Sequence, residues 1–264
     1  MDGSFLSESL RRLPQHGRPT GAGKPPNCRR LLQRFCGFWA RASTSTSRHR
    51  GEVLGIAGLV GAGRTETLRA IFGLDPIRSG QIKLKAYAGP ASPLQQWGRG
   101  MGMVSEDRKI EGLALSLSIA DNLTLSRLGR FVNPAGQAEA SRRWIKRLAI
   151  RCREPQQPVG NLSGGNQQKV AISRLLEHGV DVLLLDEPTR GIDVGAKATI
   201  YGVIDELACE GKAVLIVSSY LPELLGICDR IAVMSKGYLH RARPVSEINE
   251  HEIMVEATAT KEAA

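Results

Sequence analysis

The chain has 264 residues, of which 42% are hydrophobic, so it can bury one substantial core with room for a smaller subdomain. Its formal net charge is +10, but residues 1–50 carry ten basic and two acidic side chains, which leaves about +2 for residues 51–264. The charge of that later part therefore gives no argument for nucleic-acid binding. Five scattered cysteines without a C-x-x-C pair argue against a disulfide framework or a zinc site, and no apolar run approaches the ~20 residues of a membrane-spanning helix.

Residues 1–50 differ from the rest of the chain in composition. They are rich in arginine, proline, serine and glycine and show no helical or strand periodicity, which predicts a disordered basic segment. A targeting peptide is a second interpretation, because the segment is rich in arginine and serine and poor in acids. Its four prolines and the lack of an amphipathic stripe count against that interpretation.

From Gly51 onward, apolar runs of strand length alternate with apolar residues at helical spacing. The elements expected in chain order are a strand at 53–57, a helix at 65–72 ended by Gly73, strands at 82–84 and 101–104, a helix beginning at Ser118, helices at 138–150 and 164–176, a strand at 182–185, a helix at 195–209, a strand at 214–217, a helix at 221–226 and a strand at 231–233. Strands buried on both faces that alternate with helices predict an α/β fold with a mainly parallel sheet flanked by helices. We expect the domain to span 51–245, with a helical insertion at about 107–160 and a C-terminal tail at 246–264.

A glycine-rich loop follows the first expected strand and has the spacing of a phosphate-binding P-loop. Its residues are Gly58, Gly61, Ala62, Gly63, Arg64 and Thr65. Glycines let successive backbone N–H groups point inward at the positive end of a helix, and a threonine hydroxyl suits Mg²⁺. Arginine stands where lysine is usual, and its longer, planar, forked side chain is not an equivalent phosphate ligand. The loop predicts nucleotide binding without fast hydrolysis; the alternative is a plain glycine-rich turn.

Two carboxylates and a second glycine motif follow downstream. Asp186 and Glu187 end an apolar strand, where the first can hold the water shell of Mg²⁺. A chance acidic pair after a strand is common, but the run Asp-Glu-Pro-Thr in this context is specific. The other motif consists of Ser163, Gly164, Gly165, Asn166 and Gln167 at the start of an expected helix. Its hydroxyl, amides and helix dipole predict an anion-binding surface, although a simple N-cap followed by glycines is the alternative.

Together these motifs resemble one family. An arginine P-loop, Ser-Glu-Asp-Arg-Lys at 105–109, Leu-Ser-Gly-Gly-Asn-Gln-Gln-Lys at 162–169 and Asp-Glu-Pro-Thr-Arg-Gly-Ile-Asp-Val-Gly-Ala-Lys at 186–197 occur in this order. They are similar to the second, C-terminal ATP-binding half of fused bacterial ABC-type monosaccharide importers of the ribose, xylose and galactose type. The resemblance covers residues 51 to about 245. It implies a P-loop NTPase fold with an inserted helical subdomain of the ABC ATPase type.

The resemblance also implies roles for individual residues. Glu187 would polarise the attacking water, with ATP and Mg²⁺ as cofactors and Thr65 and Asp186 at the metal. The motif at 163–167 would complete the ATP site of an opposite subunit, and Asp193 would lie in the loop between the two sites. Ser219 occupies the place of the family's switch histidine, and Glu106 the place of a glutamine at the nucleotide. The chain is thus expected to have a degenerate ATP site of its own and an intact signature.

The implied partners are another ATP-binding half, a transmembrane sugar permease and, indirectly, a periplasmic or extracellular sugar-binding protein. The implied location is the cytoplasmic face of the cell membrane. Two alternatives stay open: a non-hydrolysing regulatory or association module, and a residual gene fragment. The family's usual strands are not seen before Gly51, so residues 1–50 are also open to interpretation as an out-of-frame or truncated reading of a longer gene.

Overall fold

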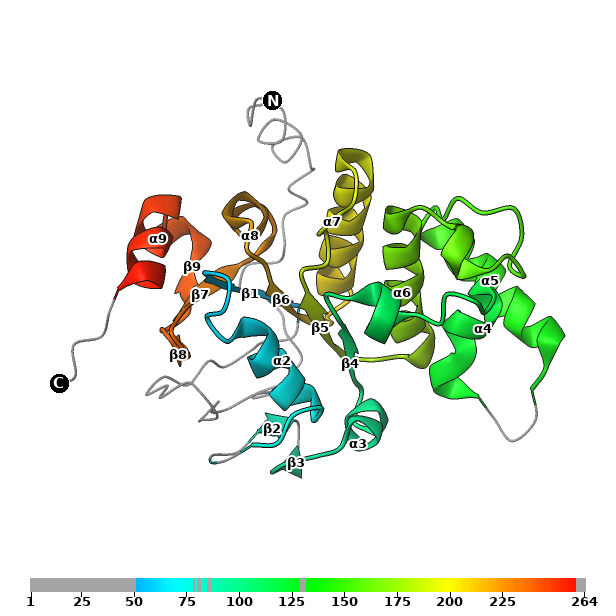
Figure 1. Ribbon diagram of the computed structural model, residues 1–264, viewed down its shortest axis with the longest axis horizontal. Coiled ribbons are helices and arrows are strands. Elements are labelled where there is room, and N and C mark those ends of the chain that lie inside the picture. The colour runs from blue at the N-terminus through cyan, green and yellow to red at the C-terminus, as the bar shows by residue number, and fades with distance from the viewer. Residues whose placement is uncertain (1–50, 78, 80–81, 85–86, 129–131, 260–264) are drawn as a thin grey trace.

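The computed structural model describes residues 51–259, apart from 78, 80–81, 85–86 and 129–131. Its centre is a seven-stranded sheet in the order β4-β5-β6-β1-β7-β8, with β9 also paired to β7 (Figure 1). The strands are β1 (Val53–Gly58), β4 (Met101–Val104), β5 (Val182–Asp186), β6 (Ala213–Val217), β7 (Arg230–Ser235), β8 (Tyr238–Leu239) and β9 (Arg243–Pro244). The pairs β4–β5, β5–β6, β6–β1 and β1–β7 are parallel, which confirms the expected α/β fold.

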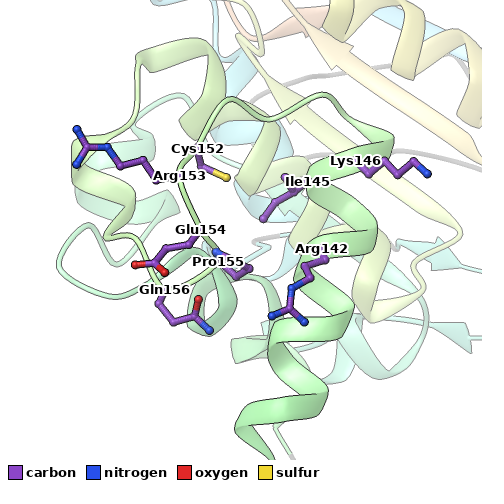
Figure 2. A pocket seen from close by; sticks show the side chains of 8 residues that line it. All are labelled: Arg142, Ile145, Lys146, Cys152, Arg153, Glu154, Pro155 and Gln156. Carbon is purple, nitrogen blue, oxygen red and sulfur yellow. The ribbon is translucent and has the colours of Figure 1, made fainter.

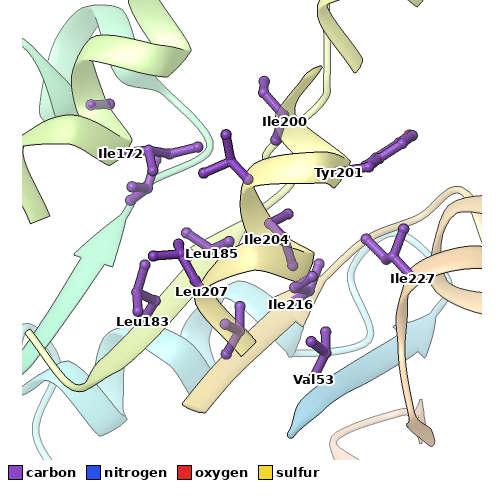
Figure 3. Packing of buried hydrophobic residues seen from close by; sticks show 14 of the residues in the cluster. Val53, Ile172, Leu183, Leu185, Ile200, Tyr201, Ile204, Leu207, Ile216 and Ile227 are labelled. Atoms are coloured by element: carbon purple, nitrogen blue, oxygen red, sulfur yellow. The ribbon is translucent and has the colours of Figure 1, made fainter. Parts of the chain in front are cut away.

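Alternating residues of the strands belong to two separate hydrophobic cores, one on each face of the sheet. Leu183 and Leu185 of β5 face one side of the sheet, whereas Val182 and Leu184 face the other. The first side is covered by α6 (Gly164–His178), α7 (Val194–Cys209), α8 (Leu221–Ile227) and α9 (Glu250–Thr258), and the second side by α2 (Arg64–Phe72). Figure 3 shows residues of α7 packed over β5, β6 and β1. Because β4, β5 and β6 are buried on both faces, nearly all of their residues are apolar rather than alternating with polar ones.

The expected helical insertion is built from short helices between β4 and α6. These are a π-helix at Arg108–Gly112, α4 (Ile119–Thr124), a 3₁₀ turn at Leu125–Arg127, α5 (Pro134–Arg147) and a 3₁₀ turn at Val159–Asn161. Ser118 and Asp121 form a capping box at the start of α4, as their spacing indicates. The helix expected at 138–150 begins earlier, with Asn133 as its cap, and ends at Arg147 because Ala149 adopts a left-handed φ of 47°.

Smaller elements complete the described residues. A two-stranded sheet of β2 (Lys83–Leu84) and β3 (Tyr87–Ala88) precedes α3 (Pro93–Gly98), so the strand expected at 82–84 belongs to a hairpin outside the main sheet. None of the described helices combines the length and the apolar character that crossing a bilayer requires. The basic segment of residues 1–50, in whose sequence the family's usual strands are not seen, lies outside the described residues.

The C-terminal segment needs a correction to the expected boundary at residue 245. A 3₁₀ turn at Val245–Glu247 leads into α9, and Ile253 of α9 is fully buried in the same core as β1 and β7. Its first turn is capped by the side chain of Asn249, which accepts a hydrogen bond from the amide of Glu252. The globular unit therefore extends to Thr258, and the described part of 246–264 is no free tail.

Candidate functional site

The P-loop joins the end of β1 to the start of α2. Gly61 and Gly63 have φ angles of 80° and 100°, in the left-handed region that favours glycine. A Cβ on Gly58 would lie 2.5 Å from the carbonyl oxygen of Met234, so the loop leaves no room for a side chain there. The first N–H groups of α2, like those of any α-helix, have no acceptor within the helix. The backbone thus has the form that binds phosphate.

Arg64 is the first residue of α2 and lies inside the protein rather than in solvent. Only 7% of its surface is exposed, and its Nη2 is 3.5 Å from Oε1 of Glu187. Its Nη1 is buried without a hydrogen-bond partner. Burial lowers the pKa of Arg64, an effect that the nearby charges of Glu187 and Asp186 oppose. A guanidinium desolvated in this way favours any further anion that can reach it.

Asp186 ends β5 directly beside the loop. The hydroxyl of Thr65 donates a hydrogen bond of 3.3 Å to its Oδ1, while its Oδ2 is buried without a partner. Burial raises the pKa of Asp186 to about 6, against the lowering effect of the Thr65 hydrogen bond. The structure therefore brings together the hydroxyl and the carboxylate that the sequence assigned to Mg²⁺. It also leaves one carboxylate oxygen free for a cation.

Glu187 is held in a specific pose by backbone groups. It has a left-handed φ of 44°, and its own amide donates to the carbonyl of Val217 at the end of β6. The amide of Ser219 donates to Oε1 of Glu187 at 2.7 Å. The same oxygen faces Arg64. The carboxylate expected to activate water is thus engaged by one cation and one amide, and Ser219 contributes its backbone rather than a cationic side chain.

The signature residues divide into an exposed and a buried set. Ser163 is exposed at the start of α6, where its Oγ accepts a hydrogen bond from Nδ2 of Asn166. Gly165 is buried, and a Cβ on this residue would lie 2.5 Å from the Cβ of Ala196 in α7, so a larger residue does not fit there. Gln167 is also buried and donates to the carbonyls of Val159 and Leu162. Ser163, with the helix start behind it, is therefore available to a ligand or partner, while Gly165 and Gln167 support it.

The segment after β4 connects to the signature and to the loop after β5. Glu106 forms an ion pair with Arg190, so its described contact is with that loop and its expected place at the nucleotide stays a prediction. Arg108 donates to the carbonyl of Arg190 and approaches Oε1 of Gln167. Asp193 accepts the amide of Ala196 and so caps α7. The expected inter-site loop is thereby tied to the segment at 105–109.

The sequence profile of the family described as "ABC transporter" matches residues 42–190, more than half of the chain. The chain belongs to the ABC transporter family. Solved structures show the same fold at low identity. The dimeric structure of the bacterial ABC transporter cassette MJ0796 superposes with a TM-score of 0.68 at 21% identity, covering 83% of this chain and 97% of that one. The ADP conformation of the ATP-binding cassette MJ1267 gives a TM-score of 0.67 at 21% identity and covers 88% and 94%. The expected P-loop NTPase fold of the ABC ATPase type is confirmed.

Curated relatives are closer in sequence. The "Ribose import ATP-binding protein RbsA 3" of Rubrobacter xylanophilus is 46% identical over 232 residues, which are 86% of this chain and 45% of that protein. The "Putative ribose/galactose/methyl galactoside import ATP-binding protein 3" of Burkholderia cenocepacia is 47% identical over 229 residues, 83% of this chain and 44% of that protein. The chain spans about half the length of the curated relatives it matches. The resemblance to monosaccharide importer ATP-binding proteins is thereby confirmed.

In this ABC transporter domain, the motifs do not reveal every residue at the site. Buried hydroxyls of Thr189 and Ser218 both donate to the carboxylate of Glu223 in α8. The only signal in the sequence is an acidic residue between the apolar Leu221 and Leu224, in the first turn of a short helix. That signal is weak, because an acid in a first turn is ordinarily a favourable exposed residue.

A surface hollow outside these motifs lacks the features of a catalytic site. It has a volume of about 400 Å³ and lies between Arg142 and Lys146 of α5 and the segment from Cys152 to Gln156 (Figure 2). Burial raises the pKa of the Cys152 thiol, which disfavours the reactive thiolate. The hollow therefore offers no activated nucleophile, and the functional argument stays with the P-loop and the signature.

Proposed function

We propose that the chain is the ATP-binding half of a monosaccharide importer, with a weak ATP site of its own and a signature that completes the site of a partner half. The observation that carries this proposal is the buried Arg64–Glu187 pair, because it places an unusual cation on the carboxylate that would activate water. The names of the curated relatives, which refer to ribose and galactose import, support the choice of sugar transport.

The residues fit ATP with Mg²⁺. The left-handed glycines and the helix start suit phosphate, and the unpartnered Nη1 of Arg64 suits a further phosphate oxygen. No group of three or more His, Cys, Asp or Glu residues in the described parts of the chain is placed to hold a metal. A Mg²⁺ ion would therefore be held by Thr65, Asp186 and nucleotide oxygens, the usual arrangement for this ion. When bound, it would neutralise phosphate charge.

The same geometry disfavours hydrolysis at this site. A general base must be free to accept a proton from water, but Glu187 already faces a guanidinium and an amide hydrogen. Ser219 supplies no positive side chain for the terminal phosphate. The fork of Arg64 also reaches across to β5, whereas a lysine is a compact point charge for phosphates. We therefore expect binding to persist while turnover is slow.

The signature surface supports a role in a second site. Ser163 is exposed at the positive end of α6, and its hydroxyl can rotate toward a phosphate on another subunit. The cassette MJ0796, which has the same fold, is dimeric. We infer that a second ATP-binding half faces this surface and carries the hydrolytic site.

Docking on a transmembrane permease, with a sugar-binding protein outside the membrane, follows from the same proposal. A groove of about 500 Å³ lies where the end of α2 meets the helical insertion, and its lining includes Phe72, Leu74 and Trp97. The Nε of Arg174, which also lines the groove, is buried without a hydrogen-bond partner among the described residues. An amphipathic permease segment with an acidic side chain fits this lining, which would place the chain at the cytoplasmic face.

The test uses the purified 264-residue chain, alone and then with a partner half that has a lysine P-loop. Alone, it should bind ATP with Mg²⁺ and turn it over slowly, as measured by titration with a fluorescent ATP analogue and by phosphate release. Arg64→Lys should raise turnover several-fold, while Arg64→Lys combined with Glu187→Gln should return it to the parent level. Vigorous hydrolysis by the parent chain would contradict a degenerate site. If Glu187→Gln and Ser163→Ala both leave the assembled pair unchanged, the chain is a regulatory or association module instead.

A further inference from the structure

A buried carboxylate connects two loops of the nucleotide site that the motifs treat as separate. Glu223 is 1% exposed, although it lies in the first turn of α8. Its Oε1 accepts a hydrogen bond of 2.8 Å from the hydroxyl of Thr189, which belongs to the loop after β5. Its Oε2 accepts one of 2.6 Å from the hydroxyl of Ser218, at the end of β6. One side chain therefore bridges the ends of two neighbouring strands.

The two bridged loops are the ones that hold Glu187. Thr189 follows Glu187 by two residues, and Ser218 precedes Ser219, whose amide donates to Glu187 at 2.7 Å. Ser218 also accepts the amide of Tyr220 on its Oγ, so its hydroxyl organises the turn that presents Ser219. If the bridge were absent, the two strand ends would be joined near this point by the backbone bond from Glu187 to Val217 and by the bond from the Ser219 amide to Glu187.

The surroundings of Glu223 make the bridge rigid. Thr189 and Ser218 are 3% and 0% exposed, so water does not compete for their hydrogen bonds. Burial raises the pKa of Glu223, while the hydrogen bonds from Ser218 and Thr189 and the charge of Lys197 favour its ionised form. Burial and the nearby charge of Glu223 raise the pKa of the Tyr201 phenol, which keeps it protonated. A buried polar network of this kind specifies one geometry when all its members are satisfied.

We propose that Glu223 is a positioning residue of the nucleotide site, which clamps the loops after β5 and β6 so that Glu187 and the amide of Ser219 stay at the place of the terminal phosphate. Glu223 touches neither nucleotide nor metal in this proposal and acts through Thr189 and Ser218. The inference rests on the proposed ATP site, because the resemblance places Glu187 and Ser219 at that phosphate.

The clamp makes a specific prediction about ATP against ADP. Both nucleotides use the P-loop, and only ATP has the terminal phosphate beside Glu187 and Ser219. Loss of the clamp should therefore lower the affinity for ATP with Mg²⁺ by about tenfold and the affinity for ADP with Mg²⁺ by much less. A general loss of folding would weaken both nucleotides equally. The ratio of the two dissociation constants is thus the measurement that separates positioning from stability.

The variants are made in the full chain and compared by calorimetric titration with each nucleotide, with thermal unfolding as a check of folding. Glu223→Ala should lower the preference for ATP about tenfold, and Glu223→Gln, which keeps the shape and one acceptor, should restore most of it. Thr189→Val should give a partial loss, and adding it to Glu223→Ala should cost little more, because both changes break the same bridge. Thr124→Val is the matched control, since Thr124 is a buried hydroxyl whose hydrogen bonds to described residues, Ala120 and Gln137, lie within the helical insertion.

The outcomes separate this inference from the function on which it rests. One outcome is that the parent chain binds ATP and that Glu223→Ala leaves the ratio of the ATP and ADP dissociation constants unchanged. This outcome would overturn the clamp but not the proposed nucleotide site. Equal losses for both nucleotides, or independent and additive effects of Thr189→Val and Glu223→Ala, would also overturn it. A parent chain that binds neither nucleotide would overturn the proposed ATP site and the clamp together.

Discussion

The P-loop region and the signature region of this chain differ in how far their polar groups are buried. In the P-loop region, Arg64, Asp186 and Glu187 are all at least 90% buried, and two of them form an ion pair. In the signature region, Ser163 is exposed, and its hydroxyl contacts only Asn166 among the described residues. One region is closed around its own charges, whereas the other presents its polar groups outward.

Under the proposed function, this difference would let one chain carry a weak ATP site and a working signature. A buried ion pair on Glu187 would reduce hydrolysis without removing the phosphate-binding backbone, since the glycines and the helix start would be unaffected. The exposed helix start needs no such charge and depends on support from Gly165, which packs against Ala196. Under the proposed function, slow hydrolysis at one site and a working signature would therefore depend on different contacts.

The largest expected effect is a change of the free energy of unfolding with pH, caused by Asp186 in the P-loop region. Burial raises the pKa of Asp186 from 3.8 to about 6, so the folded chain keeps this proton at a pH where the unfolded chain has lost it. The stability from this group is full below about pH 4, falls by up to about 3 kcal/mol as the pH rises to about 6, and levels off above that pH. In nucleotide-free chain without Mg²⁺, the unfolding free energies of parent and Asp186→Asn should diverge over this range. Urea titrations at several pH values measure the difference, and a difference independent of pH would contradict the assignment.

The second prediction concerns the metal. Asp186→Asn keeps the shape and the contact with Thr65 but removes the charge that a cation needs. ATP affinity with Mg²⁺ should fall between about tenfold and a hundredfold, while affinity in EDTA should hardly change. Parallel titrations with and without Mg²⁺ make this measurement. An equal loss in both conditions would mean that Asp186 supports the fold rather than the metal.

The third prediction sharpens the contrast from the signature side. Ser163→Ala removes a hydroxyl from the exposed helix start, so ATP binding by this chain alone should stay within about twofold. Hydrolysis by an assembled pair should fall about tenfold, the scale of one hydrogen bond to a charged group. Asn166→Ala serves as a comparison, because it removes the partner of Ser163 and leaves the hydroxyl in place. Reduced ATP binding by the isolated Ser163→Ala chain would contradict the separation of the two regions.

The fold could be predicted from the sequence more fully than the site. Strands such as Leu183–Leu185 are recognisable because burial on both faces makes them apolar throughout, and Gly63 marks the turn into α2 through its left-handed backbone. The Arg64–Glu187 pair joins residues 123 positions apart in the chain, so it depends on how β1 and β5 lie in the sheet. The role of Glu223 could not be predicted from the sequence for the same reason, since its partners are known only when the ends of β5 and β6 are placed together.

The smallest expected effect tests the loop between the two regions. Asp193 accepts the amide of Ala196 at 2.9 Å and caps α7, the helix that packs against Gly165 of the signature. Asp193→Ala should lower the unfolding free energy by about 1 kcal/mol, whereas Asp193→Asn, which caps equally well, should be close to the parent. If the Asn variant is stable yet lowers hydrolysis by an assembled pair, the charge of Asp193 serves communication beyond the cap. Asn and Asp differ in charge but cap a helix equally well, whereas Ala does not cap it. If the Ala and Asn variants are equally destabilised, the cap assignment is therefore wrong.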